Sequence, residues 1–181
     1  MKKKYWLVAG FSLGLMFACG GNSKKETMNN QKDSVSVVNA EKPYAESEQK
    51  ASLSFTMGPH TYRVSIYRYP DQKLPLVVDD MDQKYYDNSV EVSIQRDEET
   101  LASRIITKEV FKSMLPENDY RAGMLLGMNC DTARCETSRL CFTAQVGQAG
   151  EGPAFLVYIP TDGGEMCVSR DMQQEDISYR Q

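Results

Sequence analysis

Short runs of alternating apolar and polar residues recur along the chain, and this period of two is typical of half-buried strands. Residues 52–57 and 62–67 both alternate in this way, with Gly58-Pro59-His60 between them. Two such runs around a turn that contains Gly and Pro predict a β-hairpin. Pro70 ends the second strand, because proline has no backbone N–H to donate to a neighbouring strand.

The same alternation predicts further strands toward the C-terminus. Residues 90–94 form the clearest of them, and a charged turn at residues 96–99 separates them from a partner at residues 101–106. Leu140, Phe142, Ala144 and Val146 alternate in the same way and predict a strand at residues 140–146. Shorter apolar segments predict strands at residues 74–78, 123–129, 155–159 and 166–168. The run at 123–129 also suits a short helix, and a strand is the preferred interpretation.

One helix is predicted, beginning at Thr107, whose hydroxyl can accept from the free backbone N–H groups of a first turn. Its apolar face contains Val110, Phe111, Met114 and Leu115. Pro116 ends it. Many strands with one short helix predict an α+β fold that is mainly antiparallel β-sheet, because parallel sheets need a helix between successive strands. A curved sheet, a sandwich and an open barrel all remain open.

The first residues have the pattern of a signal peptide. Lys2, Lys3 and Lys4 precede an apolar stretch that reaches Phe17, and small Ala18 follows. The stretch is too short to span a hydrocarbon layer of about 30 Å as a helix. We therefore expect residues 1–18 to be removed as a secretion signal.

Leu15-Met16-Phe17-Ala18-Cys19 resembles the lipobox of bacterial lipoproteins. The resemblance implies that Cys19 becomes the first residue of the mature chain and carries lipid on its sulfur and its amine. Several acyl chains hold a protein stably at a membrane, whereas one chain does so only reversibly. The expected partner of Cys19 is therefore the membrane itself.

Composition divides the rest of the chain. Residues 20–50 are almost all polar, apart from a small apolar patch at residues 35–38, so residues 19–50 are predicted to be the lipidated cysteine and a flexible tether. Residues 51–172 are long enough for one core and are predicted to be a single globular domain. Residues 173–181 are predicted to be a polar tail.

Charge and motif content exclude several functions. Removing Lys2, Lys3 and Lys4 with the signal leaves 18 of the 21 basic residues against 25 acidic ones, a net charge of about −7, which disfavours nucleic acid as a partner. His60 is the only histidine and falls in a predicted turn, and no nucleophile or metalloprotease motif accompanies it. No catalytic residue, metal or cofactor is predicted. A hydrolase that uses two carboxylates is the remaining enzymatic alternative.

Four cysteines follow Cys19, and an even number outside the cytoplasm favours disulfides. Cys141 and Cys167 fall on the polar sides of their strands, so they would pair if those strands are neighbours. Cys130 would then pair with Cys135. This is one of three connectivities, all of which remain open, and we expect the bridges to stabilise the domain and not to react. The gaps of four, five and twenty-five residues do not suit a four-thiolate zinc site.

Tyr67 and Tyr69 alternate onto the side of their strand that is opposite Val64 and Ile66, together with Arg63. This arrangement predicts an aromatic strip that binds sugar or a partner protein. The competing interpretation is that a helix or strand covers this side, since buried tyrosines with a bonded hydroxyl are common.

Two runs in the middle of the chain carry a family resemblance: residues 85–94, which begin Tyr85-Tyr86-Asp87-Asn88, and residues 106–111. With the lipobox and the polar tether, they resemble an uncharacterised family of Bacteroidetes lipoproteins, domain of unknown function 4738. The resemblance covers most of the mature chain and implies a single envelope domain with no known activity.

The expected function is that of a membrane-anchored envelope lipoprotein with a non-catalytic binding or interaction domain. An accessory polysaccharide-binding lipoprotein is the alternative, so the expected partner is an envelope protein or a glycan. Surface-exported lipoproteins of that phylum carry acidic residues directly after the lipidated cysteine, whereas Lys24 and Lys25 precede Glu26 here. This favours an outer-membrane position facing the periplasm, with surface exposure as the alternative.

Overall fold

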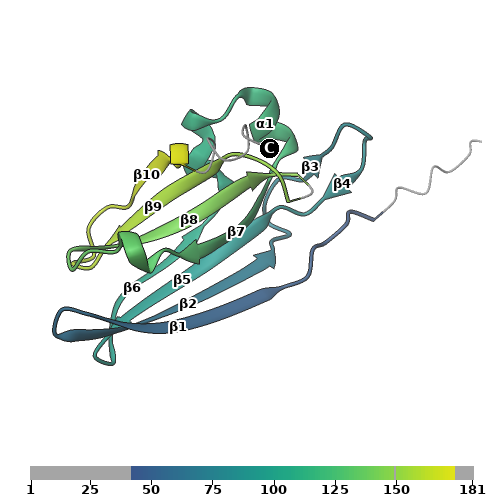
Figure 1. The fold of residues 1–181 in the computed structure, drawn as a ribbon. Coiled ribbons are helices and arrows are strands. Elements are labelled where there is room, and N and C mark those ends of the chain that lie inside the picture. The colour runs from purple at the N-terminus through teal and green to yellow at the C-terminus, as the bar shows by residue number, and fades with distance from the viewer. Residues whose placement is uncertain (1–41, 149, 174–181) are drawn as a thin grey trace, which may run out of the picture. The chain divides into compact units, whose positions relative to one another are not determined.

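The computed structural model describes residues 42–148 and 150–173. The predicted signal peptide, Cys19, the patch at residues 35–38 and the tail beyond Gln173 lie outside the described residues. Two four-stranded antiparallel sheets form most of this part of the chain (Figure 1). The first has the order β1-β2-β5-β6, with bounds Gln49–Met57, His60–Pro70, Asn88–Arg96 and Glu99–Ile106.

The second sheet has the order β10-β9-β8-β7. Its strands are β7 (Met124–Cys130), β8 (Arg139–Gly147), β9 (Ala154–Pro160) and β10 (Cys167–Arg170). A two-stranded ribbon, β3 (Val77–Val78) and β4 (Lys84–Tyr85), lies in the connection between β2 and β5. The strand predicted at residues 74–78 is thus reduced to its last two residues.

The two sheets share one hydrophobic core. Every second side chain of β2 is buried, as the alternation predicted, and β8 does the same from the other sheet. The largest fully buried side chains are aromatic: Tyr62, Phe111, Phe142 and Phe155. The prediction of an α+β fold that is mainly antiparallel sheet is therefore confirmed, and the form is two packed sheets, a sandwich.

The predicted β1–β2 hairpin is present, with Met57 opposite His60. Gly58 adopts φ of +61° in the two-residue turn, a conformation that glycine reaches without strain. His60 opens β2 instead of lying in the turn. Its ring nitrogen contacts the Asp97 carboxylate, which also accepts the N–H of Thr61 and so joins the β1–β2 turn to the β5–β6 turn.

The helical region differs from the prediction. Residues after Thr107 form a 3₁₀ helix, η1 (Lys108–Met114), and the Thr107 side chain makes no capping hydrogen bond. Phe111 is the buried anchor of η1, with its ring centroid 4.7 Å from that of Phe155. After Pro116 comes an unpredicted α-helix, α1 (Glu117–Ala122), which buries no residue and therefore shows no apolar period.

The folded region begins before residue 51. The N–H of Tyr44 donates to the Lys84 carbonyl at 2.8 Å, and Glu46 pairs with Arg68 of β2. These contacts place the last residues of the predicted tether against the ribbon and the first sheet. Among the described residues, no helix is long and apolar enough to cross a membrane.

Candidate functional site

An open cleft lies between the two sheets, where edge strand β1 faces edge strand β7. It encloses about 480 Å³. Its walls come from four strands: Gln49–Ala51 of β1, Ile66 and Arg68 of β2, Leu126–Asn129 of β7 and Thr143–Gln145 of β8. Polar and apolar groups both line it, so it is more polar than most small-molecule sites.

Arg68 is the only charged side chain among the most buried residues that line this cleft, at 5% exposure. Its guanidinium donates to the Glu46 carboxylate and, at 2.8 Å, to the Ser47 carbonyl. Its Nε finds no hydrogen-bond partner among the described residues. Burial lowers the pKa of Arg68, but an arginine keeps its charge in proteins. This Nε has almost no exposed surface, so a ligand in the cleft does not reach it.

Gly127 leaves room beside Arg68. A Cβ at this position would meet only the Arg68 Cδ, at 3.9 Å. The space results from a bulge in β7, where the register shifts between Leu125 and Gly127. Leu125 and Met128, on either side of this shift, both point into the core. They are an odd number of positions apart, so strict alternation would place them on opposite faces, and the bulge removes this conflict.

A buried polar cluster fixes the position of β7 relative to the first sheet. The Asp87 carboxylate accepts the N–H of Leu125 at 3.0 Å, and the Asn88 side chain donates to the Leu125 carbonyl at 2.9 Å. Lys108 lies 3.3 Å from Asp87 and donates to the Gly123 carbonyl at 2.7 Å. The two runs that carry the family resemblance therefore meet through Asp87 and Lys108, and they tie the sheets together.

The tyrosine strip predicted on β2 lies on the outer side of the first sheet. The ring centroids of Tyr67 and Tyr69 are 4.9 Å apart, and Lys50 lies 4.5 Å above the Tyr67 ring. The Tyr67 hydroxyl donates to Glu48, and this bond is the main cause of its raised pKa. Tyr67 and Tyr69 are both half-buried, so the strip is only partly exposed.

Arg63 shares this outer face but not the tyrosine cluster. It lines a separate shallow hollow with Thr61, Gln95, Asp97 and Glu98. The three residues predicted as one binding face are therefore on the same side of β2, yet the structure brings only the two tyrosines together.

The predicted Cys141–Cys167 bridge is wrong for this fold. Both residues face Tyr158, Cys141 from β8 and Cys167 from β10, so β9 separates them. Strands two apart are separated by about 9.6 Å, beyond the roughly 7 Å between Cα atoms that a disulfide spans. All four described cysteines are free thiols in the structure.

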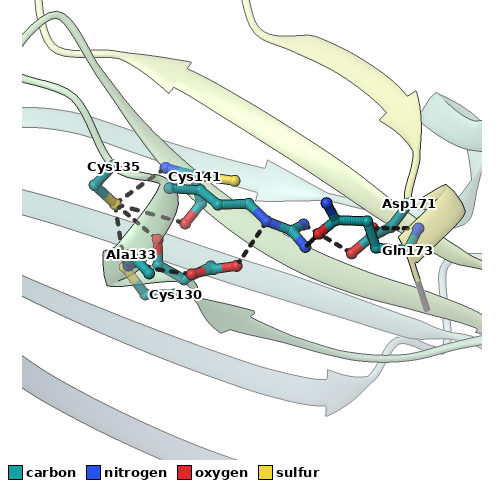
Figure 2. A network of polar contacts seen from close by, with 8 residues as sticks. Cys130, Ala133, Cys135, Cys141, Asp171 and Gln173 are labelled. Atoms are coloured by element: carbon teal, nitrogen blue, oxygen red, sulfur yellow. Dashed lines mark hydrogen bonds and ion pairs between the residues drawn. The ribbon is translucent and has the colours of Figure 1, made fainter. Parts of the chain in front are cut away.

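Cys130 and Cys135 do lie together, as predicted, with 4.0 Å between their sulfur atoms (Figure 2). Cys141 shares their neighbourhood: its N–H donates to the Cys135 sulfur at 3.3 Å. The sequence placed Cys141 correctly on the outer face of β8, but the turn before Cys135 covers it, and its side chain is fully buried. Burial raises the pKa of the Cys141 thiol.

Comparison with family models gives a match over residues 24–160, to a domain of unknown function (DUF4738). The match covers three quarters of the chain. The chain belongs to this family. The DUF4738 match contains the cleft, the Asp87–Lys108 tie and the Cys130–Cys135 turn, and it ends before β10. A search of curated proteins finds no match.

Proposed function

We propose that this DUF4738 chain is a lipid-anchored envelope lipoprotein of the Bacteroidetes type, and that its domain binds a ligand without catalysing a reaction. The pattern around Ala18 and Cys19 supports the anchor. The cleft between β1 and β7 is the proposed binding site. A periplasm-facing position at the outer membrane agrees with the order of Lys24, Lys25 and Glu26.

The observation that carries the binding proposal is the position of Arg68. It lines the cleft beside the space above Gly127, and its positive charge favours a ligand that supplies a carboxylate or carbonyl oxygen. An envelope protein or an acidic glycan has such groups. The tyrosine strip supports a sugar platform less well, because Lys50 covers the Tyr67 ring that a sugar would stack on.

Photo-crosslinking in living cells tests this site even though the ligand is unidentified. A photoreactive residue at Asn129, an exposed position on the cleft wall, should crosslink to a partner, whereas one at Ser103 on β6 should not. Gly127→Val should narrow the cleft beside Arg68 without loss of stability, because a strand accepts valine and the site has room. We expect crosslinking from Asn129 to fall at least about tenfold in this variant, equivalent to about 1.4 kcal/mol of binding free energy.

Ser103→Val adds the same side chain to an exposed position of another edge strand and is the matched control. Equal crosslinking from Asn129 and Ser103, or crosslinking that Gly127→Val leaves unchanged while the melting temperature is maintained, would contradict a binding site in this cleft.

A further inference from the structure

The end of β7 turns back so that two thiols lie side by side. Cys130 is the last residue of β7, and Cys135 follows the short 3₁₀ turn η2 (Thr132–Arg134). The Asp131 carboxylate caps this turn by accepting the N–H of Ala133 at 3.1 Å, and the Asp131 N–H donates to the Cys141 carbonyl at 2.9 Å. The backbone path that a Cys130–Cys135 disulfide requires is therefore already in place.

The turn is also held from outside, as Figure 2 shows. Arg134 lies 3.3 Å from the Asp131 carboxylate and donates to Asp171 at 2.8 Å and to Gln173 at 2.7 Å. These contacts tie η2 to the residues that follow β10. The two sulfur atoms are thus kept near each other by the fold and not only by their own contact.

The environments of the two thiols differ. The Cys135 sulfur accepts hydrogen bonds from the Cys130 thiol and from the N–H of Cys141. Both bonds stabilise a thiolate at Cys135. The Cys130 bond is the largest cause of a Cys135 pKa lowered to about 7, against the opposing effects of burial and Asp131. The same bond and partial burial raise the pKa of Cys130. When protonated, Cys135 has the Asp131 carbonyl as its acceptor, at 3.2 Å.

We propose that Cys130 and Cys135 form a reversible thiol–disulfide exchange site, with disulfides of proteins or small thiols as its substrates. The Cys135 thiolate attacks one sulfur of the substrate disulfide, which forms a mixed disulfide and releases the other half as a thiolate. Cys130 then loses its proton to solvent, and its sulfur attacks Cys135. The products are the Cys130–Cys135 disulfide and two substrate thiols, so two electrons pass from the protein to the substrate.

The other thiols do not suit these roles. Cys141 is fully buried, so a substrate disulfide cannot reach it. Cys167 is exposed on β10, but β9 lies between it and Cys141. No group of three or more His, Cys, Asp or Glu side chains among the described residues is arranged to hold a metal ion. This inference concerns the turn at the end of β7 and does not depend on binding in the cleft.

The test uses the full-length chain with Cys19→Ala, in which only these four cysteines remain. The reduced protein is equilibrated in mixtures of reduced and oxidised glutathione, free thiols are alkylated, and intact mass and peptide mapping identify the modified positions. We expect Cys130 and Cys135 to become protected together in one two-electron transition that reduced glutathione reverses. Cys141 should alkylate only after unfolding.

Single variants assign the roles. Cys130→Ser should accumulate a mixed disulfide of Cys135 with glutathione, at a level at least about tenfold above that at Cys130 in Cys135→Ser, because the thiolate is the attacking form. Cys167→Ser is the matched control and should leave the transition unchanged. Mapping of the wild-type chain provides the same assignment of the linked pair if a variant fails to fold.

Four results would overturn the proposal. One is a Cys130–Cys135 bridge that glutathione cannot reduce in the folded protein, which would make it purely structural. The second is trapping at Cys130 instead of Cys135. The third is full alkylation of both Cys130 and Cys135 in oxidised glutathione. The fourth is a metal ion bound by the thiols of the reduced protein.

Discussion

At the scale of single residues, Asp87 joins β7 to η1. It is 2% exposed, and its carboxylate accepts from Leu125 of β7 while it faces Lys108 of η1. Because Asp87 is buried, each of these contacts affects stability. A charge or donor without a partner in the interior has lost its hydration, and no protein contact offsets that cost in free energy. Asp87 therefore positions β7, and with it the wall of the cleft.

Asp87→Ala should lower the free energy of unfolding by about 3 kcal/mol or more, because it leaves the largely buried Lys108 without its counter-charge and the Leu125 N–H without its acceptor. Urea unfolding followed by circular dichroism measures the change. Asp87→Asn keeps one acceptor oxygen and should cost less. Asp80→Ala, at an exposed carboxylate in the β3–β4 turn, is the control and should have little effect. Equal stability of Asp87→Ala and Asp80→Ala would show that the contacts of Asp87 with Lys108 and Leu125 do not stabilise the fold.

Sequence patterns predicted correctly on which side of a strand a residue lies, but not which distant residues it contacts. The alternation placed Cys141, Cys167, Tyr67 and Tyr69 on the outer sides of their strands, where the structure has them. Arg68 was not singled out, since an arginine on a strand is usually exposed. Its burial depends on Glu46, twenty-two positions earlier, and no sequence pattern links the two residues.

At the scale of elements, the β8–β9 connection is the tightest part of the second sheet. A Cβ on Gly147, the last residue of β8, would lie 1.8 Å from the Glu151 carbonyl oxygen. The contact is with backbone, so it cannot be relieved by rotating a side chain. Glycine at this position allows the chain to pass close to itself and to return as β9.

Gly147→Ala should therefore destabilise the domain by about 3 kcal/mol or more, the upper range for overpacking. Gly127→Ala makes the same change on β7, where the nearest atom is the Arg68 Cδ at 3.9 Å, and should leave stability unchanged or slightly higher. Thermal unfolding of the two variants side by side provides the comparison. A smaller loss for Gly147→Ala than for Gly127→Ala would show that the turn relaxes in a way the structure does not indicate.

At the scale of the whole molecule, one core joins two sheets and the 3₁₀ helix η1. The free edge strands β1 and β7 leave the cleft between them, and the thiol pair lies where β7 ends and the chain turns into η2. The domain therefore presents two separate candidate sites. Anchoring at the N-terminal side would set where in the envelope both sites operate.

Cys19→Ala should abolish fatty-acid labelling and release the protein from the membrane fraction, because no other lipid attachment is predicted. Fractionation of cells grown with a labelled fatty acid measures both effects. Cys167→Ala removes a cysteine from the domain and should keep the label and the membrane position. Unchanged labelling and retention in Cys19→Ala would refute the lipobox interpretation.

The sequence by itself determined the class of fold and most strand positions. A period of two along β2, β5 and β8 is a local property, because each strand buries one face more than the other. The continuous apolar run of β9 is local as well. The resemblance to domain of unknown function 4738 was likewise present in residues 85–94 and 106–111, and the match over residues 24–160 confirms membership of that domain family. Helix α1 was not predicted because it has no amphipathic pattern. The segment that forms η1 was predicted to be an α-helix, because a few apolar positions suit 3₁₀ and α-helical turns alike.

Only the tertiary structure decided which strands are neighbours beyond the two predicted pairs, β1–β2 and β5–β6. The order β10-β9-β8 separates Cys141 from Cys167, and the bulge in β7 opens the cleft beside Gly127. The pairing of Glu46 with Arg68 and of Asp87 with Lys108 also joins residues far apart in the chain. Such contacts depend on how the two sheets pack and on which partners the buried charges find. A local pattern of apolar and polar residues predicts neither.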